Sequence, residues 1–119
     1  MSPGNVVRIL RHGTTRHRAD AILKNGPDAR FIEPGGVDSA RGFSTCPEHG
    51  PFPCGTADEY AARKASLFPN EGGPAIIEIE VPEDIADLGI DAGGEIRFEP
   101  GNGLDELLTA WPMIAKKVL

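Results

Sequence analysis

The stretch VVRILRHGTTRHRADAILKNG, residues 6–26, decides the fold because a strand pattern is followed directly by a helix pattern. Its first part, residues 6–12, is mostly apolar and starts with β-branched side chains, which favours a β-strand. The chain is then expected to turn at Gly13. Thr14 or Thr15 can cap the next element, because a threonine hydroxyl accepts a hydrogen bond from a backbone amide of the first helical turn.

The predicted helix carries apolar side chains at the spacing of one helical face, namely Ala19, Ile22 and Leu23. Gly26 suits the left-handed conformation that often ends a helix, and Pro27 follows it directly. The helix is therefore expected to end at Gly26.

Positive charge gathers around the predicted turn, on Arg11, Arg16, His17 and Arg18. The whole chain has a net charge of −6, which is not the composition of a uniformly basic nucleic-acid-binding protein. Residues 71–106 hold eleven acids and a single basic residue, so the two signs are segregated along the chain. A local basic site favours an anionic small ligand. The alternatives are a solvated charged face, or a surface that docks on nucleic acid or an acidic partner.

The remaining elements are short and separated by loops rich in glycine and proline. They are a strand at 42–46, a helix from the capping box of Thr56 and Glu59 to residue 68, strands at 74–82 and 95–99, and a tail at 104–119 that combines a helix with a strand. Short strands mixed with helices in 119 residues predict one α+β domain over residues 1–119.

Apolar runs in this sequence are short. None approaches the roughly 20 residues that a membrane span requires, and the N-terminus does not have the pattern of a signal peptide. We therefore expect a cytoplasmic protein without a membrane partner.

Two cysteines and a histidine lie close together in the loop CPEHGPFPC, as Cys46, His49 and Cys54. These side chains are zinc ligands, but structural zinc sites normally have four ligands, and His17 is the one candidate for the fourth. A proline-stiffened surface loop over a ligand cleft is the favoured interpretation, with metal binding as the alternative.

The order of several motifs resembles the ADP-ribosyltransferase family, over about residues 8–100. RHGTT and AILKNG are followed by GFSTC, DEYAARKA, GPAIIEIEVP and GEIRF. The sequence is most similar to the branch that contains diphtheria toxin and the poly(ADP-ribose) polymerases, whose signature is a His-Tyr-Glu triad. This resemblance implies two small, mostly antiparallel sheets around an NAD-binding cleft, with flanking helices.

The resemblance also implies a role for each triad residue. His12 would bind the adenosine ribose of NAD⁺, Tyr60 would stack on nicotinamide, and Glu95 would hold the 2′-hydroxyl of the reacting ribose. Gly13 would bind the carboxamide of nicotinamide through its backbone. Further contacts are expected from Ser44 to nicotinamide or ribose, and from Thr14, Arg16 and Arg18 in the cation-rich turn, where the two arginines would bind the pyrophosphate.

Glu95 has rivals in Glu78, Glu80 and Glu99, which lie on the same or the preceding predicted strand. Glu95 is preferred because it follows the glycine turn at the start of its strand, as in the family. Gly93 occupies the position where an arginine-modifying branch of the family has a glutamate or glutamine, so modification of arginine is disfavoured.

The expected activity is transfer of ADP-ribose from NAD⁺ to a protein or nucleic acid, or hydrolysis of NAD⁺, without a metal. The small size suggests a toxin-like module with an inhibitor protein as partner. The alternatives are an inactive module that binds NAD⁺ or ADP-ribose, a small interaction protein that uses the arginine-rich turn, and, ranked lower, an RNA 2′-phosphotransferase.

Overall fold

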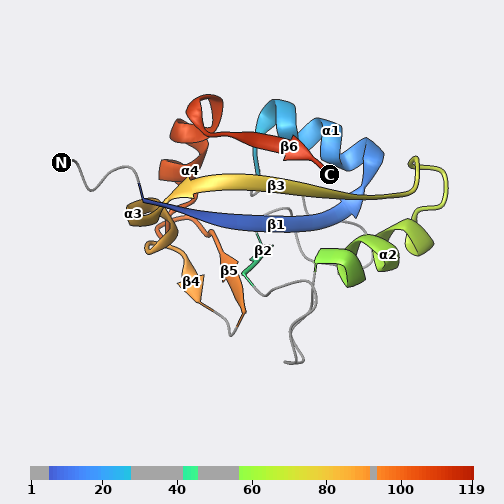
Figure 1. Cartoon of the computed structure of the whole chain (residues 1–119), viewed down its shortest axis with the longest axis horizontal. Helices are drawn as coiled ribbons and strands as arrows, with labels where there is room; N and C mark the ends of the chain where they lie inside the picture. Colours follow the sequence, from blue (N-terminus) through green and yellow to red (C-terminus); the bar gives the residue numbers. More distant parts are fainter. Residues whose placement is uncertain (1–5, 28–41, 46–56, 92–93) are drawn as a thin grey trace.

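The computed structural model of the chain describes residues 6–27, 42–45, 57–91 and 94–119. Within these ranges, six strands and four α-helices form a small compact α+β domain (Figure 1). The strands are β1 (Val7–Thr15), β2 (Gly42–Ser44), β3 (Pro74–Pro82), β4 (Ile90–Asp91), β5 (Glu95–Arg97) and β6 (Lys116–Val118). The helices are α1 (Arg16–Asn25), α2 (Ala57–Leu67), α3 (Glu83–Ala86) and α4 (Leu104–Ala110), with a 3-10 turn, η3 (Trp111–Met113), after α4.

The described strands form one antiparallel sheet in the order β4-β5-β2-β1-β3-β6. Strands β1, β3 and β6 run side by side, whereas β2, β5 and β4 cross their direction (Figure 1). The two halves meet through a single residue pair, Arg11 of β1 and Ser44 of β2. The expectation of two separate sheets is therefore wrong for the described strands, because β1 pairs with β2 and joins the two halves into one sheet.

The long half of the sheet is built on β1 and β3, which pair from Val7–Pro82 to Thr15–Pro74. In β3 the alternation expected from the sequence is confirmed, since Ile77, Ile79 and Val81 are all buried. Leu10 and His12 pair with Ile79 and Ile77 and are also buried. His12 thus lies on the core face of the sheet, beside apolar side chains.

Strand β1 does not end at His12 as predicted, and the chain does not turn at Gly13. The strand continues to Thr15 because β3 supplies pairing partners along its whole length. Gly13 instead lies against the first turn of α2. A Cβ atom there would overlap the carbonyl oxygen of Ala57 and lie 2.6 Å from the amide nitrogen of Ala61. Since both contacts are helix backbone, only glycine permits this close approach.

The two longer helices are confirmed. Thr15 caps α1, its hydroxyl accepting from the Arg18 amide, and Gly26 ends that helix at a positive φ of 84°. Helix α2 is present, but Thr56 of its expected capping box lies outside the described residues.

The C-terminal tail forms the expected helix and strand, α4 and β6. Two short elements that the sequence analysis did not predict, α3 and β4, lie between β3 and β5. Among the residues that the structure describes, none of the helices has both the length and the apolar character needed to span a bilayer.

Candidate active site

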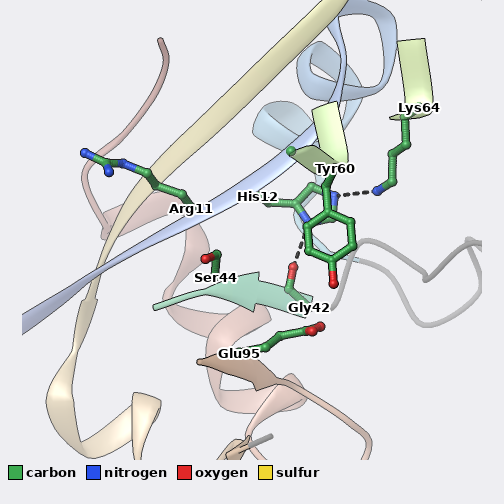
Figure 2. A pocket seen from close by; sticks show the side chains of 8 residues that line it. Arg11, His12, Gly42, Ser44, Tyr60, Lys64 and Glu95 are labelled. Carbon is green, nitrogen blue, oxygen red and sulfur yellow. Dashed lines mark hydrogen bonds between the residues drawn. The ribbon is translucent and has the colours of Figure 1, made fainter. Parts of the chain in front are cut away.

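A pocket opens where β1, β2, β5 and α2 meet (Figure 2). It is lined by Arg11, His12, Gly13, Gly42, Ser44, Tyr60, Lys64 and Glu95. Its empty space, open mouth included, is about 320 Å³.

The pocket exists because β1 and β2 diverge after their single pair at Arg11 and Ser44. Beyond that pair, the edge of β1 is approached by α2, which packs on Gly13. Strand β2 continues away from β1 but stays paired with β5 along all three of its residues. The opening between the two halves of the sheet is therefore a direct result of the topology.

His12 lies on the floor of this pocket, with 5% of its surface exposed. Its Nδ1 is 2.7 Å from the carbonyl oxygen of Gly42. Since a carbonyl can only accept a hydrogen bond, Nδ1 carries the proton and Nε2 of the neutral ring is an acceptor. Nε2 is 3.4 Å from Nζ of Lys64, which donates to it (Figure 2).

The pKa of His12 is lowered from 6.5 to about 3, mainly by burial and also by the nearby ammonium of Lys64, while the hydrogen bond to Gly42 acts in the opposite direction. His12 is therefore neutral at physiological pH. A neutral ring with a fixed tautomer offers a ligand one acceptor nitrogen.

Lys64 is a buried lysine, with 2% of its surface exposed. It belongs to the buried face of α2 together with Ala57 and Ala61, at three- and four-residue spacing. The two alanines let the helix approach β1 closely. The longer lysine side chain reaches past them, and its ammonium group is directed at the His12 imidazole (Figure 2).

Glu95 begins β5 and pairs with Ser44 of β2. Its side chain crosses diagonally to Gly42, where the carboxylate occupies the space that a Cβ atom would fill. Gly42 therefore contacts both acid and imidazole, its α-carbon meeting Glu95 and its carbonyl oxygen meeting His12. A larger residue at position 42 would displace the carboxylate from the pocket.

Tyr60 is half-buried on α2, one helical turn before Lys64. Its hydroxyl points toward the side of the pocket where the Glu95 carboxylate lies (Figure 2). The ring presents an aromatic surface to the pocket. A planar group can stack on such a surface, and a cationic ring does so with an additional electrostatic gain.

Five of the residues proposed from the sequence line this one pocket: His12, Gly13, Ser44, Tyr60 and Glu95. Thr14, Arg16 and Arg18 are not among the lining residues described. Thr14 is fully buried beside His12, and Arg16 is exposed at the start of α1. Of the rival carboxylates, Glu78 bonds Arg11 at 3.4 Å, Glu99 lies 3.5 Å from Arg97, and Glu80 is exposed.

Arg18 belongs to a second cluster, which we call the Arg18–Glu71 clamp and which consists of Thr15, Arg18, Phe68 and Glu71. Nε of Arg18 donates to Oε1 of Glu71 at 2.7 Å, and the Thr15 hydroxyl donates to the same oxygen at 2.8 Å. The guanidinium also lies over the Phe68 ring, 4.1 Å from its centre. The clamp ties the start of α1 to the turn that follows α2.

Sequence reasoning missed Lys64 and Gly42. A signal for Lys64 was present, because it follows Ala57 and Ala61 on one helical stripe and so falls on the buried face. Gly42 carried no comparable signal, since its role depends on which strands pair on either side of β2.

The described residues contain no cluster of three or more histidine, cysteine, aspartate or glutamate side chains that could hold a metal ion. Cys46, His49 and Cys54 lie outside the described residues. The chain matches no protein-family model, no curated protein and no solved structure.

Proposed function

We propose that this protein is an NAD⁺-dependent ADP-ribosyltransferase, with a fold of the ADP-ribosyltransferase type. It transfers ADP-ribose to a protein or nucleic-acid acceptor and releases nicotinamide, and it hydrolyses NAD⁺ when water takes the place of the acceptor. One observation carries this proposal. His12, Tyr60 and Glu95 come from three different elements, β1, α2 and β5, and line one pocket.

The pocket offers different kinds of contact to different parts of NAD⁺. Tyr60 presents a ring face for the pyridinium, which is a planar cation. Nε2 of His12 is a neutral acceptor for a hydroxyl of the adenosine ribose. The Glu95 carboxylate, beside Gly42, is placed to accept from another hydroxyl.

Glu95 has the central role in the proposed chemistry. The bond between the nicotinamide nitrogen and the ribose C1′ breaks, and its electron pair leaves with nicotinamide, which becomes neutral. The sugar then carries positive charge, as in glycoside hydrolysis, and a nearby carboxylate stabilises it. The oxygen of the acceptor or of water bonds to C1′, and Glu95 takes its proton.

The proposal is tested by incubating the protein with NAD⁺ and measuring free nicotinamide. Glu95→Gln should lower the rate by about a hundredfold or more, since positioned acid–base groups contribute that much. Glu99→Gln is the matched control, because Glu99 follows on the same stretch but is not among the described pocket residues. It should release nicotinamide at the parental rate. Equal rates for the parent and Glu95→Gln would refute the role of Glu95.

Binding without chemistry is a distinct outcome of the same experiment. If calorimetry detects NAD⁺ binding but no nicotinamide is released, the protein is a binding module and the transferase assignment is wrong. Circular dichroism of both variants shows whether a lost activity reflects a lost fold.

A further inference from the structure

Gly42 begins β2 and takes part in the pocket twice, through its carbonyl oxygen and through the side chain that it lacks. The oxygen accepts a hydrogen bond from Nδ1 of His12 at 2.7 Å. A Cβ atom on its α-carbon would overlap Oε1 of Glu95 and lie 3.3 Å from Cδ of that side chain. One residue of β2 thus borders both the imidazole from β1 and the carboxylate from β5 (Figure 2).

Glu95 approaches Gly42 diagonally across the strand pair. Glu95 is paired with Ser44, whereas Gly42 is paired with Arg97, two residues further along β5. A long side chain on one strand reaches the diagonal position of the neighbouring strand, where it normally meets another side chain. At position 42 it meets an α-carbon instead, and the carboxylate occupies the space that a side chain would fill.

The backbone conformation does not require a glycine at position 42, since the φ of Gly42 is not positive, unlike that of Gly26. Helix packing does not require it either. A Cβ atom at position 13 would collide with the backbone of α2, whereas the three nearest described atoms to a Cβ at position 42, chain neighbours aside, all belong to the flexible side chain of Glu95. Glycine weakens a strand and often marks a place that another group approaches closely. Here that group is the Glu95 carboxylate.

We propose that Gly42 is a positioning residue of the transferase site, because its missing side chain sets where the Glu95 carboxylate lies and its carbonyl oxygen fixes the tautomer of His12. The inference rests on the proposed function, which gives Glu95 its chemical role. With a larger residue at position 42 the carboxylate has to rotate away, while the backbone carbonyl remains available to His12. Gly42→Ala therefore separates the placement of the acid from the state of the imidazole.

Gly42→Ala should lower the rate of nicotinamide release at saturating NAD⁺ by about tenfold to a hundredfold, the usual effect of displacing a reacting group by about 1 Å. The double variant Gly42→Ala/Glu95→Gln tests whether this loss passes through Glu95. Its rate should lie within about threefold of that of Glu95→Gln alone, since two changes that act through one group are not additive. A parental rate in Gly42→Ala, or full additivity in the double variant, would overturn the inference.

Gly13→Ala is the matched contrast, because it adds the same methyl group to the other glycine among the described lining residues. It should lower the urea concentration at which half of the protein is unfolded, since the helix backbone that it meets cannot rotate away. Gly42→Ala should unfold at the parental urea concentration, because only the end of a side chain has to move. Equal losses of stability would mean that Gly42 serves the fold, and would overturn the inference.

The placement of the carboxylate is also measurable by NMR without any activity. Cγ of Glu95 lies 3.9 Å from the position of a Cβ atom on Gly42, so the γ-protons of Glu95 should give a nuclear Overhauser effect with the α-protons of Gly42. The effect should weaken in Gly42→Ala. If the parent shows this pattern but does not cleave NAD⁺, the proposed function fails and the placement of Glu95 by Gly42 stands. No effect in the parent, or equal effects in both proteins, would overturn the inference.

Discussion

The pocket and the Arg18–Glu71 clamp both contain residues of the stretch 6–26, namely His12 in the pocket and Arg18 in the clamp. The two side chains have different partners. In the clamp, a guanidinium meets a carboxylate at 2.7 Å, and the hydrogen bond lowers the pKa of Glu71. In the pocket, an ammonium group faces a neutral imidazole, and burial lowers the pKa of His12. The clamp joins opposite charges at 2.7 Å, whereas the pocket gathers an ammonium group, an imidazole and a carboxylate in one lining.

This difference shows that a basic side chain in a cation-rich stretch can be paired within the protein. Arg18, which the sequence analysis expected to bind the pyrophosphate, bonds to Glu71, a residue distant along the chain. Lys64 lies in an ordinary helical sequence, and the packing of α2 on Gly13 carries it into the pocket. The partner that the fold supplies decides what each cation does.

The largest expected difference between the two regions is in the response to acid. Folded His12 stays neutral well below pH 6.5, whereas the unfolded imidazole takes up a proton there. The unfolded state therefore binds more protons, and acid favours unfolding. Between pH 6.5 and pH 5 this residue should lower the free energy of unfolding by about 1.5 kcal/mol, measured by urea denaturation at several pH values.

His12→Gln removes this titration, so its stability should fall less than that of the parent over the same pH interval. Identical slopes for the parent and His12→Gln would mean that the imidazole is not held neutral in the folded protein.

A smaller effect is expected in the clamp. Glu71→Gln removes a partly exposed ion pair and should lower the free energy of unfolding by about 1 kcal/mol at pH 7. Because the folded pKa of Glu71 lies below its ordinary value of 4.5, the stabilisation is present above pH 4.5 and is lost as the pH falls through the folded pKa. Denaturation of the parent and the variant should therefore converge in acid.

The activity of Glu71→Gln tests whether the clamp takes part in NAD⁺ binding. If NAD⁺ binds in the pocket alone, this substitution leaves its binding unchanged. Its KM for NAD⁺ should equal the parental value. Glu80→Gln, at an exposed position of β3, controls for the loss of one negative charge. A large rise of the KM in Glu71→Gln alone would place the clamp in the binding site.

Local patterns predicted the elements well. Alternation gave β3 its buried face, and Thr15 and Gly26 marked both ends of α1. The end of β1 was not predictable in this way, because glycine after a histidine resembles a turn. The strand continues because β3 pairs with it, which is a contact between distant parts of the chain.

The candidate site was predictable where a residue carried the resemblance noted in the sequence, as for His12, Tyr60 and Glu95. Their convergence in one pocket depends on how β2 and β5 pair and how α2 packs, and the sequence does not encode these contacts locally. The same reason explains Lys64 and Gly42, whose roles depend on neighbours from other elements.

The most direct test is to titrate the isotopically labelled Glu95→Gln variant with NAD⁺ and to monitor the backbone amide signals by NMR. It shows whether NAD⁺ binds in the pocket or at the clamp. This variant should keep the ligand intact during the measurement. We expect NAD⁺ to shift the amide signals of Gly13, Ser44 and Tyr60 while those of Arg18 and Glu71 stay in place. Shifts concentrated on Arg18 and Glu71, or no shifts at all, would contradict the assignment of the pocket as the NAD⁺ site.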